Sequence, residues 1–133
     1  MLELHCIVVT PERTVRDESV DFVALPLFDG EIGIAPGHTP MIGRLGAGEL
    51  RLMHAEGVSR YYVEGGFVEV HAGVVSVLTG RAVPAEALDS TVAAEQLESA
   101  RQRRVRAPEE FALRDAQVAR LRAQLRVARR AGS

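Results

Sequence analysis

Alternating apolar and polar positions predict short β-strands along the first two thirds of the chain. The predicted inward face of the first strand holds Leu2, Leu4, Cys6 and Val8. Further runs of this kind, separated by Gly-containing turns, occupy residues 20–25, 49–54, 58–63, 67–71 and 74–79. Pro26 is expected to end the second run. Many short strands at this spacing predict a sandwich or a flattened barrel.

The last third of the chain has a helical pattern. A first helix is expected from Asp89 or Ser90, either of which suits an N-cap, to about Arg103. Pro108 suits the first position of a second helix, because its missing N–H is not needed there. The apolar stripe of this second helix is predicted to hold Val118, Leu121, Leu125 and Ala128.

Composition changes where the pattern changes. Eleven of the twelve Gly and twelve of the seventeen Val lie within residues 1–80, whereas thirteen of the eighteen Ala lie after them. Val packs well on a pleated surface, and Ala loses little free energy in a helix. We therefore predict an α+β chain, with a β-sandwich domain at 1–84 and an antiparallel helical hairpin at 85–133.

Charge is distributed unevenly, although its total is small. The formal net charge is −2, which argues against a surface built throughout for nucleic acid. Residues 101–133 contain ten Arg and three acidic residues, a net charge of +7. This segment admits three interpretations: a solvated helix face, docking on an acidic protein surface, or nucleic-acid binding. Phe111 is the only aromatic residue of the predicted helices, so base stacking has little support.

Residues suited to catalysis or metal binding are few and scattered. Cys6 is the only cysteine, which excludes an internal disulfide and favours a core residue in a reducing cytoplasm. The four His have no helical pair spacing, so no metal site is predicted. Residues 43–48 are Gly-rich but lack the Gly-Lys-Ser/Thr ending of a phosphate-binding loop, and a turn is expected there. No apolar run reaches the roughly 18 residues of a membrane span.

Three segments carry a family resemblance. Residues 30–41 (GEIGIAPGHTPM), residues 62–70 (YVEGGFVEV) followed by 74–78, and residues 123–127 (AQLRV) stand in this order along the chain. They resemble the signature segment, the next block and the last helix of the epsilon subunit of F-type ATP synthase, whose mitochondrial counterpart is called delta. The resemblance extends over essentially the whole chain.

The resemblance implies a sandwich of about ten strands, a helical hairpin and a role in the rotating central stalk. A subunit of this kind is not itself an enzyme: it couples c-ring rotation through gamma to ATP synthesis. The implied partners are gamma, the ring of c subunits, and alpha and beta through the hairpin, with no nucleic acid. The implied location is the cytoplasmic face of the bacterial inner membrane, reached only through the complex. No catalytic residue, cofactor or metal is expected.

Three residues near the signature segment correspond to partner contacts of the family. Asp29 and Glu31 fall in a loop that the family turns toward the c ring. His38 falls on the side presented to gamma. An exposed loop acid and a turn-stabilising hydrogen bond are the alternative explanations for Glu31 and His38.

The cationic second helix corresponds to an inhibitory element of the family. There the hairpin can leave the sandwich, extend along gamma and obstruct ATP hydrolysis, with basic residues facing an acidic segment of beta. The residues at the corresponding positions are Arg114, Arg122, Arg126, Arg129 and Arg130.

A nucleotide-binding motif of some family members is incomplete. That motif has Ile or Leu, Asp, two variable residues, Arg and Ala, whereas residues 88–93 are LDSTVA, with Val92 in the Arg position. A charge-assisted phosphate contact is worth about 1.5–3 kcal/mol. Asp89, Arg122 and Arg126 are therefore only weak candidates for contacts to ATP, and no bound nucleotide is predicted.

Two other functions compete with the rotor subunit. One is a free-standing adaptor or nucleic-acid-binding module with an Arg-rich helical tail. The other is a small hydrolase that uses Asp29 or Glu31 with His38, for which no orienting partner is evident in the sequence.

Overall fold

Strand β1 (Leu4–Val9) shows how the alternating pattern becomes a buried sheet. Its residues alternate between buried and half-buried, with Leu4, Cys6 and Val8 facing the core. The computed structural model describes residues 3–131, so Leu2, predicted on the same face, lies outside the described residues. Because successive side chains of a strand point to opposite faces of the sheet, this alternation places one face of the strand against the core.

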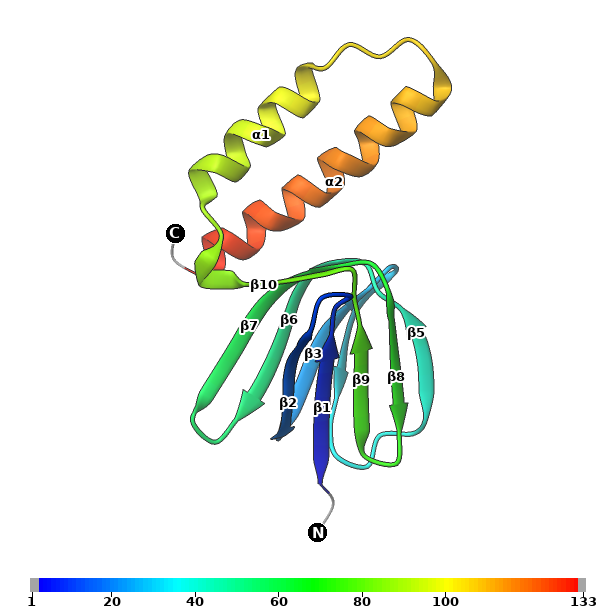
Figure 1. The fold of residues 1–133 in the computed structure, drawn as a ribbon, viewed down its shortest axis with the longest axis vertical. Coiled ribbons are helices and arrows are strands. Elements are labelled where there is room, and N and C mark those ends of the chain that lie inside the picture. Colours follow the sequence, from blue (N-terminus) through cyan, green and yellow to red (C-terminus); the bar gives the residue numbers. More distant parts are fainter. Residues whose placement is uncertain (1–2, 132–133) are drawn as a thin grey trace.

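Nine further strands follow β1, and together they form two stacked five-stranded sheets (Figure 1). They are β2 (Thr14–Val20), β3 (Phe22–Leu27), β4 (Gly30–Ile34), β5 (Met41–Arg44), β6 (Ala47–His54), β7 (Gly57–Glu64), β8 (Phe67–His71), β9 (Val74–Leu78) and β10 (Arg81–Pro84). The strand order is β2-β1-β9-β8-β5 in the first sheet and β10-β7-β6-β3-β4 in the second. The predicted sandwich of about ten strands is confirmed.

The core lies between the two sheets. Its members come from residues 4–82, and its largest fully buried side chains include Leu25, Leu50 and Leu52 of the second sheet. Cys6 is fully buried there, as expected. Burial and the nearby Glu18 carboxylate raise the pKa of its thiol to about 12, so the thiol stays protonated at neutral pH.

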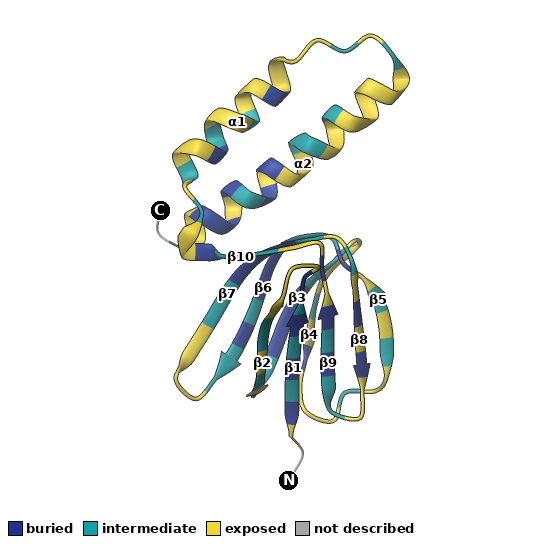
Figure 2. Cartoon of the chain, viewed as in Figure 1, coloured by how far each residue is buried: buried dark blue, intermediate teal, exposed yellow. Residues whose placement is uncertain are grey.

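The helical hairpin follows the sandwich through a short 3-10 turn, η1 (Ala85–Ala87). Helix α1 (Ser90–Gln102) begins after Asp89, whose carboxylate accepts hydrogen bonds from the backbone N–H groups of Thr91 and Val92. Helix α2 (Pro108–Arg130) has Pro108 in its first turn, and its buried stripe includes Leu121, Leu125 and Ala128. The helical pattern and both predicted starts are confirmed, and most of α1 faces solvent (Figure 2).

Helix α2 packs on the outer face of the second sheet, against β6 and β7. The apolar part of this contact is small: Tyr62 and Ala85 meet Ala123 and Val127. The Tyr62 hydroxyl donates to the Glu64 carboxylate at 2.6 Å. Burial first, and the Glu64 carboxylate second, raise the pKa of Tyr62. The apolar part of the attachment is thus one aromatic ring and a few small side chains.

Four strands differ from the predicted set, and all four are edges of the sheets. β2, β5, β10 and β4 were not predicted as strands, and they end the two strand orders. Residues 30 and 31, expected in a loop, belong to β4, and most of residues 43–48, expected as a turn, belong to β5 and β6. These edge strands carry glycine, polar or charged residues at many positions, so the alternating apolar signal is weak in them.

The expected end of the second run at Pro26 is wrong, since β3 continues to Leu27. The pairing of β3 with β6 stops at Ala24. Beyond that point the Pro26 carbonyl accepts from the Gly46 N–H at 3.0 Å. The missing N–H of Pro26 therefore falls on the side where the ladder to β6 has already ended.

The turn between β7 and β8 contains two glycines that differ in how closely other backbone atoms approach them. Gly65 and Gly66 both have positive φ, of 69° and 102°. A Cβ at residue 66 would lie 1.9 Å from the Leu78 carbonyl oxygen, whereas one at residue 65 would meet nothing within 4 Å. We expect Gly65→Ala to cost about 1 kcal/mol of unfolding free energy and Gly66→Ala more than about 3 kcal/mol. Urea unfolding measures both, and equal losses would contradict the close approach.

Candidate functional site

Asp29 and Glu31 lie where β3 turns into β4, at the end of the sandwich that faces α2. The Glu31 carboxylate accepts a hydrogen bond from Arg51 at 2.9 Å, while half of its side chain stays exposed. Hydrogen bonds to Glu49 and Glu31 raise the pKa of Arg51. Glu31 is therefore held in a fixed ion pair on a strand, not in a mobile loop, and it still presents an acidic edge to solvent.

His38 lies in the loop that joins β4 to β5, beyond the opposite end of β4. β4 alone spans roughly 13 Å, so His38 is well separated from Asp29. Its Nδ1 donates to the Thr39 carbonyl at 2.7 Å, and its backbone N–H donates to Ala35. The residue is exposed. The turn-stabilising hydrogen bond is present, and the Nε2 atom is left for contact with solvent or a partner.

An exposed apolar surface runs along β5, and we call it the β5 face. Phe28 is 68% exposed, Ile42 75%, Phe67 57% and Leu78 53%. Arg44 pairs across the sheet with Phe67, which pairs in turn with Leu78. The Arg44 guanidinium also lies over the Phe28 ring, 5.9 Å from its centroid. The β5 face therefore consists of Ile42, Arg44, Phe67 and Leu78 on the outer side of the first sheet, together with Phe28 from the turn between β3 and β4, whose backbone N–H donates to the Arg44 carbonyl.

The β5 face was not predicted, although one signal for it is present in the sequence. Phe67 precedes the inward-facing Val68 and Val70, so its phase in the strand is the outward one. An outward-facing large apolar side chain points to an interaction surface only when it belongs to a contiguous apolar patch. The pairing of Phe67 with Arg44, by contrast, depends on the position of an edge strand that the pattern does not reveal.

The five predicted arginines of α2 point to three different places. Arg114 and Arg122 line a hollow with Arg101, and Arg114 also pairs with Asp115 at 3.5 Å. Arg126 and Arg130 line a groove between α2 and the sandwich, beside Glu31 and Glu49. Arg129 is exposed. In this docked arrangement the cations do not form one continuous face.

The proposed nucleotide contacts are not brought together. The Asp89 carboxylate is used as the cap of α1, and Val92 is nearly half exposed. Arg122 and Arg126 line the two separate hollows described above. These positions do not converge on one phosphate-sized site.

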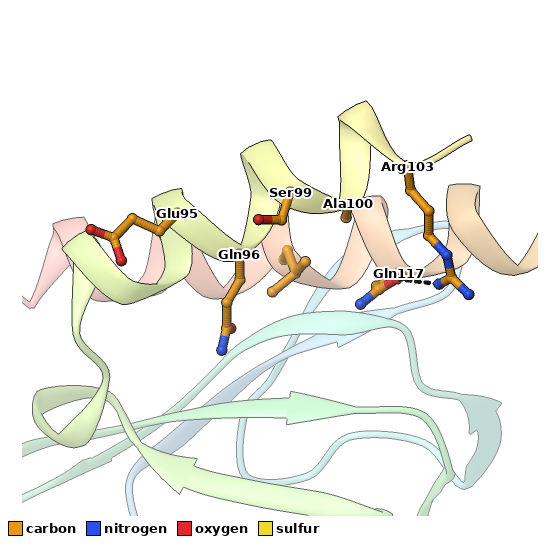
Figure 3. A pocket seen from close by; sticks show the side chains of 7 residues that line it. Glu95, Gln96, Ser99, Ala100, Arg103 and Gln117 are labelled. Atoms are coloured by element: carbon orange, nitrogen blue, oxygen red, sulfur yellow. Dashed lines mark hydrogen bonds between the residues drawn. The ribbon is translucent and has the colours of Figure 1, made fainter. Parts of the chain in front are cut away.

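A third hollow lies between the two helices (Figure 3). It has a volume of about 540 Å³ and is lined by Glu95, Gln96, Ser99, Ala100, Arg103, Gln117 and Leu121. Glu95 and Arg103 lie at its opposite ends, and the Arg103 guanidinium donates to Gln117 at 3.4 Å. Its charged groups do not point at a common centre.

Catalytic and metal-binding arrangements have little support in the described part of the chain. No hydrogen bond or ion pair joins His38 to Asp29 or Glu31 within residues 3–131. No group of three potential ligands suited to a metal ion occurs there either. None of the helices in these residues is long and apolar enough to span a bilayer.

Comparison with protein families and sequences gives consistent matches. The family described as "ATP synthase, Delta/Epsilon chain, beta-sandwich domain" matches residues 3–85. An ATP synthase epsilon chain of Rhodopirellula baltica is 51% identical over 128 residues, which cover 96% of this chain and all of that one. An ATP synthase epsilon chain of Bordetella avium is 39% identical over 133 residues, covering 98% and 94%.

Two solved structures share the fold. A chain of the Euglena gracilis mitochondrial ATP synthase superposes with a TM-score of 0.85 at 24% identity, covering 92% of this chain and 79% of that one. A chain of the Tetrahymena thermophila mitochondrial ATP synthase central stalk and c ring gives 0.73 at 13% identity, covering 94% and 96%. At these identities the superpositions establish the common architecture of sandwich and hairpin.

Titration of the native chain with ATP tests the interpretation of residues 88–93. We expect no saturable heat up to about millimolar ATP, because the motif lacks one guanidinium and a lost charge-assisted contact weakens binding by roughly ten- to 150-fold. Isothermal calorimetry measures this directly. Saturable binding at millimolar concentration or below would contradict it.

Proposed function

The chain belongs to the ATP synthase delta/epsilon family, and from this premise we propose that it is a non-catalytic subunit of the rotating central stalk. The observation that carries the proposal is 51% identity to an ATP synthase epsilon chain over 96% of this chain. In this role the subunit passes c-ring rotation through gamma to the catalytic head, and it acts at the cytoplasmic face of the bacterial inner membrane as a peripheral part of the complex.

The β5 face is the proposed docking surface for gamma. Its exposed apolar side chains lie on a rigid sheet, and such patches on a folded domain are typical of protein interfaces. Ile42 lies on β5, and His38, a predicted contact, lies in the loop that leads into this strand. Arg44 adds a cation between two aromatic rings, which suits a partner with an acidic or backbone acceptor next to an apolar stripe.

Asp29, in the turn before β4, and Glu31, the second residue of β4, form the proposed contact with the c ring. Asp29 follows Phe28, a member of the β5 face, so this contact adjoins the surface assigned to gamma. Glu31 is fixed by Arg51 and stays half exposed. A fixed carboxylate fits polar loops of a ring that turns together with the stalk.

The hairpin at 85–133 is the proposed inhibitory element, and residues 1–84 are the docking unit. The sandwich core contains no helix residue, whereas the hairpin is attached through a small contact. After release, Arg114, Arg122, Arg126, Arg129 and Arg130 would meet the acidic segment of beta. Such an electrostatic contact weakens as salt rises.

Charge introduced on the β5 face tests the gamma contact. We expect Ile42→Glu to bind the alpha/beta/gamma head at least about tenfold more weakly than the native chain, because an exposed apolar contact is replaced by a carboxylate that lies directly across from Glu69. Val58→Glu, at an exposed apolar position of the other sheet, serves as the matched control. Co-elution with a head depleted of this subunit measures both. Equal binding of the two variants would rule out the β5 face.

Removal of the hairpin tests the inhibitory role. A chain of residues 1–84 keeps all ten strands, so we expect it to bind the head and to leave ATP hydrolysis faster than the full chain does. Hydrolysis is measured at equal occupancy of the two forms. If both forms give the same rate, the hairpin does not inhibit this complex.

A further inference from the structure

Glu49 is a buried carboxylate at the contact between hairpin and sandwich. Its side chain is 3% exposed, and it lies on β6 directly across from Tyr62 of β7, on the outer face of the second sheet. Buried carboxylates are found with cationic partners, because an unpaired charge is costly to remove from water. The partners of Glu49 therefore determine what its burial does.

Three guanidinium groups converge on one oxygen of Glu49. Arg51 lies 3.1 Å from Oε1, Arg60 3.2 Å and Arg130 3.6 Å. Arg51 and Arg60 come from the sandwich and face each other across β6 and β7. Arg130 comes from the last turn of α2. The Glu49 carboxylate is thus the group that allows a cation of the hairpin to lie beside two cations of the sandwich.

A second, weaker ion pair reinforces the same contact. Arg120 of α2 lies 3.9 Å from Glu64, the carboxylate that also accepts the Tyr62 hydroxyl. Glu49 lies directly across from Tyr62, and Glu64 accepts the Tyr62 hydroxyl, so both carboxylates border this ring. The docked hairpin therefore meets two sandwich carboxylates around one aromatic ring.

We propose that Glu49, through Arg130, is the latch that keeps the hairpin docked on the sandwich. The inference rests on the proposed function in one respect: Arg130 is also a proposed contact to beta, so one guanidinium serves either the docked or the inhibitory state. Docking and inhibition then compete for the same cation. Loss of the Glu49 charge leaves three guanidiniums around a neutral amide, and their mutual repulsion opposes docking.

Opening of the latch is measured on the isolated full chain with a thiol reporter. Val127→Cys places a thiol at a position that is 3% exposed and packs against Tyr62 and Ala123. Cys6 reports opening of the sandwich in the same sample, because it is fully buried in the main core. Rapid labelling of residue 127 with slow labelling of Cys6 identifies undocking without unfolding.

In the Val127→Cys background we expect Glu49→Gln to raise the labelling rate of residue 127 at least about tenfold. Arg130→Gln should raise it several-fold, because Arg51 and Arg60 still neutralise Glu49. In the double variant, residue 127 should be labelled more slowly than the product of the two single effects predicts. The double variant lacks both the attraction between Glu49 and Arg130 and the repulsion of Arg130 by Arg51 and Arg60. Glu12→Gln and Arg104→Gln, charge changes at exposed positions, are the controls.

The latch is refuted if the labelling rate of residue 127 in Glu49→Gln and in Arg130→Gln is no higher than in the two controls while Cys6 stays protected. Rapid labelling of Cys6 in Glu49→Gln assigns Glu49 to the stability of the sandwich and also contradicts the latch. A separate assay in the assembled complex tests inhibition: Glu49→Gln should lower ATP hydrolysis, and Arg130→Gln should not. Fast labelling in the isolated chain with unchanged hydrolysis supports the latch and contradicts the inhibitory role.

Discussion

The contact of α2 with the outer face of β6 and β7 determines how the two parts of this molecule behave. It joins Tyr62 and Ala85 to Ala123 and Val127, with ion pairs from Glu49 and Glu64 at its margins. Small side chains bury little apolar area, so this contact contributes far less than the core between the sheets. We therefore expect the hairpin to undock at a lower free-energy cost than opening of the sandwich, which is the property that a switchable element needs.

The rigid part and the switchable part present different chemistry. The sandwich exposes the apolar β5 face and the fixed acidic turn at Asp29 and Glu31, both of which remain in place whichever way the hairpin lies. The hairpin exposes guanidinium groups, and the strength of their electrostatic interactions depends on which carboxylates are near. Permanent attachment through the sheet and reversible electrostatic contact through α2 thus fit the proposed division between a rotor coupling and an inhibitor.

Inner strands and helices were predictable from the sequence because their physical signals are local. Burial on one face produces the alternation of Leu4, Cys6 and Val8, and the missing N–H of Pro108 marks a helix start. The edge strands could not be found in this way, since β2 is rich in polar and charged residues and β4 contains two glycines, so their inward apolar residues give only a weak alternation. The ion pair between Glu49 and Arg130 joins β6 to the end of α2, and only the docking geometry brings these residues together. The contacts at Asp29, Glu31 and His38 came from the family resemblance, and partner binding at these residues stays a prediction.

The central claim is that the β5 face holds the chain against gamma in an assembled ATP synthase. The most direct measurement places a photoreactive amino acid at residue 42 of the full chain, assembles the complex, irradiates it and identifies the cross-linked subunit by mass spectrometry. A cross-link from residue 42 to gamma, absent when the same group is placed at residue 58, is the result that the structure leads us to expect. A cross-link from residue 42 to alpha, beta or c alone, or none in the assembled complex, would contradict the claim.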